Sequence, residues 1–286
     1  VLLVLLIFAF ELWSIWITLD GTARLSLLIV GSFLHVFWLV AHIESMCTSP
    51  GYLPWFWSIE QRKRYSYKEM WGGIITNRKQ YEFAVNGVCP ERAFVSNSGR
   101  RIVLKADMNC GWINNWVGNG NYRYFFVMLI WLFFLFLFYI AVFICDMADI
   151  GKNGWKLTAP RIVFFVTVLP VVIIFVYFIR FFIGVISNML HNRTRVFDDD
   201  VKNVYDLGDY QNCQETFGPF WCSPCWFFPV PLPTIRDGIM WVRNDGVQSS
   251  FNLATEDPEA NQIELVKESI YQEGEFYIPQ NTVPEL

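Results

Sequence analysis

Charged residues are scarce in this chain. Asp, Glu, Lys and Arg make up 17% of its 286 residues, whereas hydrophobic residues make up 54% and aromatic residues 18%. Because a soluble domain carries about 25% charged residues, the composition excludes an ordinary soluble fold and predicts a membrane protein. The net charge of −4 and the lack of basic runs interleaved with aromatic residues exclude nucleic acid as a partner.

The chain also lacks the cysteine pattern of a secreted, disulfide-bonded module. Its seven cysteines are an odd number scattered over loops and apolar segments: Cys47, Cys89, Cys110, Cys145, Cys213, Cys222 and Cys225. We therefore expect reduced thiols that face the cytosol. The last three include the one Cys-x2-Cys pair, which has no fourth zinc ligand nearby, so we interpret them as reduced or lipidated cysteines against the membrane rather than a zinc knuckle.

Long apolar runs are abundant. Four of them reach the roughly 20 residues that a helix needs to cross a bilayer: residues 1–19, 25–43, 124–147 and 161–188. In the first run the apolar character continues past Glu11, which favours a membrane span over a signal peptide. The short connections at residues 20–24 and 148–160 predict two antiparallel hairpins. The expected fold is therefore an all-α membrane protein with four transmembrane helices in two hairpins.

This topology places both termini and the central segment on one side of the membrane. Lys and Arg are denser in that segment than in the two short loops, which predicts a cytosolic location. The predicted organisation is a hairpin at residues 1–43, a cytosolic loop domain at 44–123, a second hairpin at 124–188, a cytosolic C-terminal segment at 189–245 and an acidic tail at 246–286. We expect other protein subunits to dock the tail, because such a composition does not fold alone.

Ionisable residues inside the spans are costly and therefore notable. Glu11 and Arg180 fall within predicted spans, where we expect a partner inside the helix bundle for the acid and either a partner or an interfacial position for the Arg. A functional role is the alternative for each. Pro170 predicts a kink in the fourth span.

Residues 107–125 carry the pattern that suggests chemistry. They read Asp-Met-Asn-Cys-Gly-Trp-Ile-Asn-Asn-Trp-Val-Gly, two further residues, then Asn-Tyr-Arg-Tyr-Phe. This pattern resembles the signature of the DHHC protein S-acyltransferases (palmitoyltransferases), which begins Asp-His-His-Cys-Pro-Trp-Val-Asn-Asn-Cys-Val-Gly. The resemblance implies that Cys110 matches the nucleophile that takes an acyl group from acyl-CoA, and that Asp107 matches the acid that orients the histidine base.

Histidine is missing from this motif. Met108 and Asn109 occupy the two histidine positions of the tetrad, and a thioether does not accept a proton at any useful pH. A cysteine thiol needs a base or a cationic neighbour to become a nucleophile. The chain has only His35, His42 and His191, none of them between residues 43 and 190. The sequence therefore predicts that the catalytic relay is lost.

The zinc ligands that the resemblance implies are missing as well. The family builds this loop around two zinc ions held by cysteine and histidine. Without gaps, the eight ligand positions fall on Glu82, Val85, Val95, Ser96, Gly99, Ile102, Asn109 and Trp116. None is a Cys or His, so we predict that the loop binds no zinc and is held by packing and hydrogen bonds instead.

Scaffold positions of the signature are retained. They comprise Trp112, Asn114, Asn115, Gly118, Asn121, Tyr122 and Arg123, together with Asn203, Tyr205 and Asp206 of an Asn-Pro-Tyr-Asp-like segment. Ser49-Pro50-Gly51 keeps the turn of the family's Asp-Pro-Gly motif without its acid, and residues 194–197 keep one Thr of Thr-Thr-x-Glu. Turns and packing residues persist while acids and bases are lost.

Two functional interpretations remain open. The first is a structural or scaffold subunit of a membrane complex that has the family's architecture, no cofactor and no catalysis. The alternative is an active S-palmitoyltransferase that binds acyl-CoA and is acylated at Cys110, with activation by Asp107, by Lys105 or Arg123, or by a partner protein. A channel or transporter finds no support, because no Gly/Pro-broken pair of spans is evident.

Overall fold

The computed structural model describes residues 9, 11–13, 15–16, 21–53, 92–96, 101–154, 158–196, 203–232, 238 and 241–245. Most of the predicted first span, the acidic tail at 246–286 and the ligand positions Glu82, Val85 and Gly99 lie outside these residues. The chain divides into two compact units. Unit 1 comprises Val1–Cys47, Arg123–Met189 and Phe217–Pro233, and unit 2 comprises Thr48–Tyr122, Leu190–Thr216 and Thr234–Leu286.

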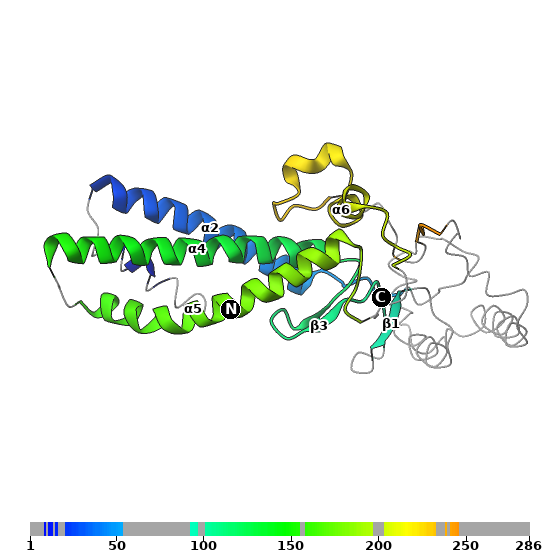
Figure 1. The fold of residues 1–286 in the computed structure, drawn as a ribbon, viewed down its shortest axis with the longest axis horizontal. Helices are drawn as coiled ribbons and strands as arrows, with labels where there is room; N and C mark the ends of the chain where they lie inside the picture. The colour runs from blue at the N-terminus through cyan, green and yellow to red at the C-terminus, as the bar shows by residue number, and fades with distance from the viewer. Residues whose placement is uncertain are drawn as a thin grey trace, which may run out of the picture. The chain divides into compact units, whose positions relative to one another are not determined.

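Unit 1 is built on three long helices, which lie side by side in Figure 1: α2 (Gly21–Cys47), α4 (Tyr122–Asn153) and α5 (Ala159–Leu190). Each is long and apolar enough to cross a membrane. They coincide with the second, third and fourth predicted spans, so the chain is an integral membrane protein that contacts the lipid bilayer. Continuous apolar runs made these helices predictable without any periodicity.

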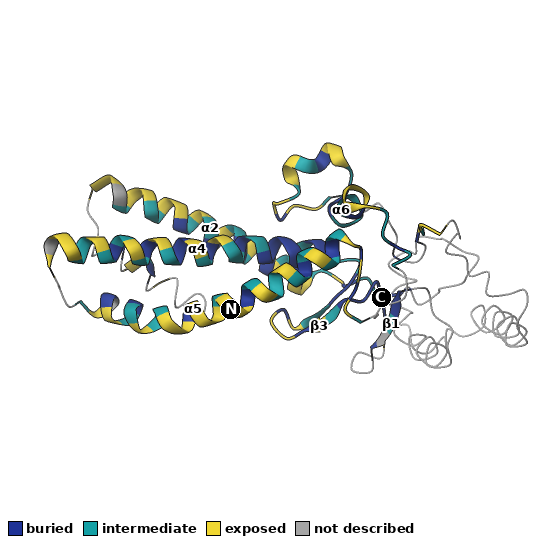
Figure 2. Ribbon diagram, viewed as in Figure 1, coloured by how far each residue is buried: buried dark blue, intermediate teal, exposed yellow. Residues whose placement is uncertain are grey.

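Small residues and close packing join the helices. A Cβ atom added to Gly31 of α2 would lie 2.7 Å from the Phe138 ring of α4, so only glycine permits this approach. Phe138, Tyr139 and Val142 of α4 form a buried core with Phe164 and Val171 of α5. The three helices carry exposed apolar residues, as expected of surfaces solvated by lipid. Figure 2 colours the exposed parts of the ribbon yellow.

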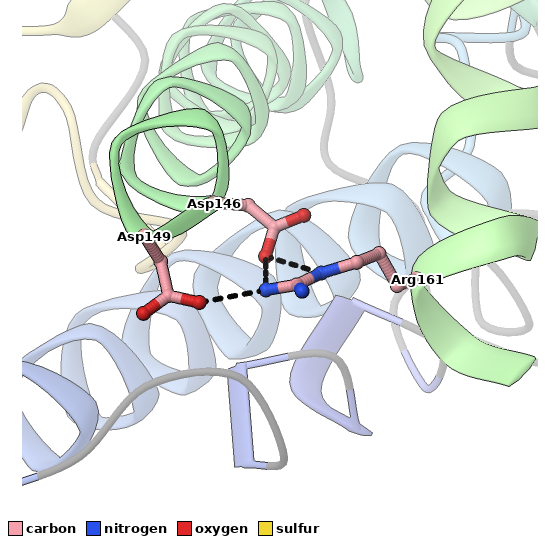
Figure 3. Close-up of polar contacts among 3 residues, drawn as sticks. All are labelled: Asp146, Asp149 and Arg161. Carbon is pink, nitrogen blue, oxygen red and sulfur yellow. Dashed lines mark hydrogen bonds and ion pairs between the residues drawn. The ribbon is translucent and has the colours of Figure 1, made fainter. Parts of the chain in front are cut away.

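A buried ionic cluster closes the α4–α5 hairpin (Figure 3). The Arg161 guanidinium contacts Asp146 Oδ1 at 2.8 Å and Asp149 Oδ2 at 2.9 Å. Both Arg161 and Asp146 are buried. Gly154, with φ +75°, ends the helix and donates its N–H to the Ile150 carbonyl, which is a common way to cap a helix C-terminus.

Glu11 and Arg180, two ionisable residues within the predicted spans, have different environments. Glu11 is buried, and its Oε2 lies 3.9 Å from His35 Nε2 of α2. Arg180 is exposed and lies within α5, ten residues before its last residue, Leu190. Pro170 lies inside α5, and the helix continues through it.

Unit 2 contains β-structure, which the all-α prediction omitted. β1 (Ala93–Ser96) pairs with β2 (Arg101–Leu104), and β3 (Met108–Cys110) pairs with β4 (Asn115–Val117), both antiparallel. Residues 51–53 extend the first pair, because Leu53 N donates to Ile102 O and Leu104 N donates to Gly51 O. Strands of three or four residues are too short for an alternating pattern to be recognised in a sequence.

The C-terminal part adds two short elements. α6 (Asp209–Phe217) begins just after Gly208, whose φ is +91°. The 3-10 helix η1 (Phe220–Cys225) belongs to unit 1.

Candidate functional site

The tetrad of residues 107–110 lies on one arm of a tight hairpin. Met108, Asn109 and Cys110 of β3 pair with Val117, Trp116 and Asn115 of β4. The connecting turn places Asn114 at φ 48°, a conformation that asparagine tolerates better than most residues. The hairpin therefore fixes where each tetrad side chain points, and strand alternation sends Asn109 to the opposite side from its neighbours.

Asp107 is buried and bonded to the backbone of a distant segment. Its Oδ1 accepts the N–H of Arg195 at 3.0 Å, 88 residues further along the chain. Burial raises the pKa of the Asp107 carboxyl, while the hydrogen bond and the charge of Arg195 act in the opposite direction. The carboxylate thus ties β3 to the segment after α5.

The surroundings of Met108 and Cys110 differ from those of a catalytic base and its cysteine nucleophile. The Met108 sulfur lies 2.8 Å from a guanidinium nitrogen of Arg195, so a cation stands beside the position where the family has its base. Cys110 is 4% exposed. A thiol that is buried in this way packs as a small apolar residue.

Lys105 is a buried cation next to the tetrad. It has φ 45°, and its ammonium lies 5.2 Å from the centre of the Trp241 ring and 5.8 Å from that of Tyr122. Burial, and then the charge of Arg92, lower the pKa of Lys105 to about 7. Lys105 therefore exists partly as a neutral amine near neutral pH.

Arg92 forms the centre of a clamp that we call the Arg92 clamp, comprising Arg92, Asn192, Tyr205 and Trp241. The guanidinium donates to Asn192 Oδ1 at 3.0 Å and to Asn192 O at 2.7 Å. Its central carbon lies 4.6 Å from the centres of both the Tyr205 and the Trp241 rings. Asn192 in turn donates to Tyr205 O and to Glu215. Cation–π contacts and charged hydrogen bonds thus join three distant stretches of chain.

The retained signature residues lie mostly in scaffold positions. Asn115 donates to Thr48 O, and Asn121 donates to Trp116 O and accepts the N–H of Gly118. A Cβ atom on Gly118 would come within 2.4 Å of the Pro50 carbonyl, so this turn packs directly against the Ser49-Pro50-Gly51 turn. Trp112 is 70% exposed and does not join this cluster.

The remaining signature residues also hold backbone. Arg123 donates to the carbonyls of Cys225, Phe228 and Val230. Asn203 donates to His191 O, while Asp206 Oδ1 accepts from Gly208 N and from Asn212 Nδ2. Tyr205 supplies one ring of the Arg92 clamp. These side chains order the loops that they contact.

Comparison with known proteins gives a consistent assignment. A sequence model described as DHHC palmitoyltransferase matches residues 75–199. "Probable protein S-acyltransferase 12" of Arabidopsis thaliana is 27% identical over 237 residues, which cover 74% of this chain and 78% of that protein. Palmitoyltransferase ZDHHC3-A of Danio rerio is 25% identical over 120 residues, covering 41% of this chain and 35% of that protein. The domain match at residues 75–199 and the similarity to these two proteins both support the DHHC palmitoyltransferase family.

Zinc, which the DHHC family resemblance implies, does not fit the described ligand positions. Ser96 and Trp116 both occupy such positions, and the Trp116 indole N–H donates to Ser96 Oγ at 3.0 Å. Ile102 is buried and Asn109 is exposed. Within the described part of the chain, no group of three or more His, Cys, Asp or Glu side chains is placed to hold a metal ion. A side-chain hydrogen bond therefore joins two positions where family members have zinc ligands.

Several residues that organise unit 2 were missed by sequence reasoning. They are Arg92, Asn192, Arg195, Asn212 and Trp241. Arg92 and Arg195 read in the sequence as ordinary cytosolic basic residues. Of these residues, Asn212 could most easily have been found from the sequence, because it lies four residues after the Asn-Val-Tyr-Asp-Leu-Gly segment. Its side chain donates to the Leu190 carbonyl.

Proposed function

We propose that this DHHC-family membrane protein is a non-catalytic, structural subunit of a membrane complex. The observation that carries the proposal is the environment of the tetrad. The Asp107 carboxylate receives a backbone N–H, and the thioether next to it contacts a guanidinium. An acid can orient a base only if a base is present, and neither methionine nor arginine serves as one at cytosolic pH.

The environment of Cys110 supports the same proposal. Acyl transfer requires a thiolate that acyl-CoA can reach. A buried structural thiol is inert compared with a partly exposed thiol in electropositive surroundings. Cys110 is buried within the β3–β4 hairpin. Its retention is then explained by packing, because a small apolar side chain fits the position.

The loop domain is proposed to fold without zinc or another cofactor. The Arg92 clamp, the Ser96–Trp116 hydrogen bond and the buried side chains of Ile102, Val103 and Leu104 supply the contacts that metal ions would otherwise provide. The termini and the loop domain are proposed to face the cytosol, with other subunits docking the acidic tail. Protease protection of tagged, sealed vesicles tests the orientation.

Labelling with an alkyne-tagged palmitoyl-CoA tests the loss of activity. Purified protein in detergent is expected to gain no hydroxylamine-sensitive label at Cys110 above the level of Cys110→Ala. A DHHC-family enzyme with an intact tetrad, treated in parallel, shows that the assay detects acylation. Label on the wild-type protein that is lost only in Cys110→Ala would overturn the proposal.

The environment of Lys105 favours a second candidate, an active S-palmitoyltransferase with Cys110 as nucleophile. Because its pKa is lowered to about 7, Lys105 can release and accept protons at cytosolic pH. If the wild-type protein is labelled, Lys105→Met is expected to lower the labelling rate by about 100-fold under this candidate. An unchanged rate in Lys105→Met would exclude Lys105 as the activating group.

A further inference from the structure

The segment at residues 218–232, here called the C-terminal apolar segment, has an exposed apolar surface. It contains no charged residue, and four of its fifteen residues are prolines. Trp221 is 76% exposed and Phe227 is 51% exposed, and Phe220 is exposed as well. Exposed aromatic side chains of this kind are typical of the membrane–water interface, where tryptophan is enriched.

Four backbone carbonyls of this segment accept hydrogen bonds from side chains of α4, which suits a medium without water. Arg123 of α4 donates to the carbonyls of Cys225, Phe228 and Val230. Trp131 of α4 donates its indole N–H to the Phe227 carbonyl at 2.8 Å. Irregular backbone is tolerated at membrane depth only where its polar groups find partners in the protein. The four prolines also reduce the number of polar groups without a partner, because proline has no backbone N–H that needs an acceptor.

The contacts with α4 also indicate how deeply the C-terminal apolar segment enters the bilayer. The apolar span Tyr122–Lys152 has 31 residues, and about 20 residues cross the hydrocarbon core, so each end extends roughly five residues, or about 8 Å, beyond it. Trp131 lies nine residues past Tyr122, which is about 13 Å along the helix axis. For an untilted span centred in the bilayer, Trp131 and the Phe227 carbonyl bonded to it lie about 5 Å inside the hydrocarbon boundary.

The segment and α2 together form an apolar groove. It has a volume of about 410 Å³ and is lined by Val36, Phe37 and Val40 of α2 and by Cys225, Phe228, Pro229 and Val230. Phe37 stacks on Trp131 and meets the Phe228 ring edge-on, at centroid distances of 4.9 and 5.5 Å. Val36 and Val40 are also part of the exposed face of a membrane span, so the groove continues the surface that contacts lipid.

We propose that the C-terminal apolar segment is a second membrane-contact element, which enters the bilayer beside α2 and α4, and that the groove holds an acyl chain of a bilayer lipid. The lipid chain covers the apolar groove walls, and the exposed aromatic rings anchor the segment at the interface. The proposal stands whether or not Cys110 is acylated, because no catalytic group takes part.

Photo-crosslinking to lipid tests the interfacial part. The full chain carries p-benzoylphenylalanine in place of Trp221 or Phe227, and the matched control is Tyr210→p-benzoylphenylalanine, because Tyr210 is an aromatic residue of α6 that is 56% exposed. In phosphatidylcholine vesicles, irradiation is expected to give lipid adducts at residues 221 and 227 on the order of tenfold more often than at residue 210. Equal yields at the three positions would overturn the proposal.

A probe inside the groove tests the acyl chain. Cys225→p-benzoylphenylalanine is expected to yield a phosphatidylcholine adduct, located by mass spectrometry on the peptide that contains residue 225. Val36→p-benzoylphenylalanine probes the opposite wall and serves if the first variant does not fold. A crosslink from these positions to residues 246–286, or to a second copy of the chain, in place of lipid would refute the acyl-chain assignment.

Discussion

A single guanidinium, that of Arg92, joins parts of unit 2 that are far apart in the sequence. It is buried, and its partners are one asparagine that offers two oxygens and two aromatic rings. Lysine cannot reproduce this geometry, because an ammonium lacks the planar fork that donates to two oxygens while stacking between rings. The arrangement makes Arg92 the residue on which we expect the loop domain to depend most strongly.

Replacing Arg92 is expected to destabilise unit 2. Arg92→Ala removes two charged hydrogen bonds and two cation–π contacts, which together are worth about 3 kcal/mol or more of unfolding free energy. Pulse proteolysis across a denaturant series, read on fragments of the loop domain, measures this loss. Arg101→Ala is the matched control, because Arg101 stacks on Tyr52 at 3.9 Å in an exposed position and should cost less than about 1 kcal/mol. Equal losses for both variants would contradict the clamp.

Lys105 gives the loop domain a pH-dependent stability. Its pKa is about 7 in the folded protein, against an ordinary value of 10.5. Between these values the unfolded chain binds a proton that the folded protein has released, so Lys105 makes stability rise with pH from about 7 to about 10.5. Below about pH 7 both states are protonated, and the folded state bears the full cost of the buried charge.

Lys105→Met is therefore expected to raise the melting temperature at about pH 6.5 and to lose this advantage as the pH approaches about 10. Differential scanning fluorimetry of variant and wild type at matched pH values measures the difference. Lys152→Met, at an exposed position on α4, controls for the loss of a lysine as such. An advantage that stays constant over this range would show that the Lys105 charge does not respond to pH as stated.

At the scale of elements, the two β-hairpins are joined through Ser96 and Trp116, which occupy positions where the DHHC family has zinc ligands. Trp116 of β4 donates to Ser96 at the end of β1, and its ring packs at 5.3 Å from Phe94. A hydrogen bond and a ring contact hold elements together less strongly than a structural zinc site, whose binding supplies about 10 kcal/mol or more. Under the proposal of a zinc-free loop domain, the hairpins gain the rest of their stability from buried apolar side chains.

A double-mutant cycle on Ser96 and Trp116 tests this connection. Ser96→Ala and Trp116→Phe each remove one partner, and the coupling free energy between them is expected to be about 1 kcal/mol. If the loop domain folds without zinc as proposed, elemental analysis of the purified protein is expected to find none, and chelator should leave the melting temperature unchanged. Near-stoichiometric zinc, or a coupling of zero, would count against the interpretation.

The α4–α5 hairpin depends on the ionic cluster of Figure 3. Arg161→Met leaves Asp146 buried without its charge partner, which is expected to cost about 3–5 kcal/mol. Asp149→Asn is the graded control, because the Asp149 side chain is partly exposed and Asp146 still pairs with Arg161. Thermal unfolding in detergent compares the two variants. The expectation fails if Asp149→Asn is as damaging as Arg161→Met.

For the whole molecule, the sequence predicted the described spans well because a continuous apolar run needs no context to be recognised. The hairpin that carries Cys110 was found by its motif and not by its strands, which are too short to show a period. Arg92 and Asn192 could not be paired in advance, because they are 100 residues apart and neither type of residue specifies a partner. Likewise, loss of ligands at Ser96 and Trp116 was visible in the sequence, but their hydrogen bond was not.

The wide sequence separation within the Arg92 clamp has a consequence for biosynthesis. Arg92 is made 100 residues before Asn192, and the ring of Trp241 follows still later. The clamp can close only after α5 has left the ribosome, so the loop domain has to wait, incompletely folded, while two helices enter the membrane. High contact order of this kind slows folding. During this interval the nascent loop would be a natural client of chaperones on its side of the membrane.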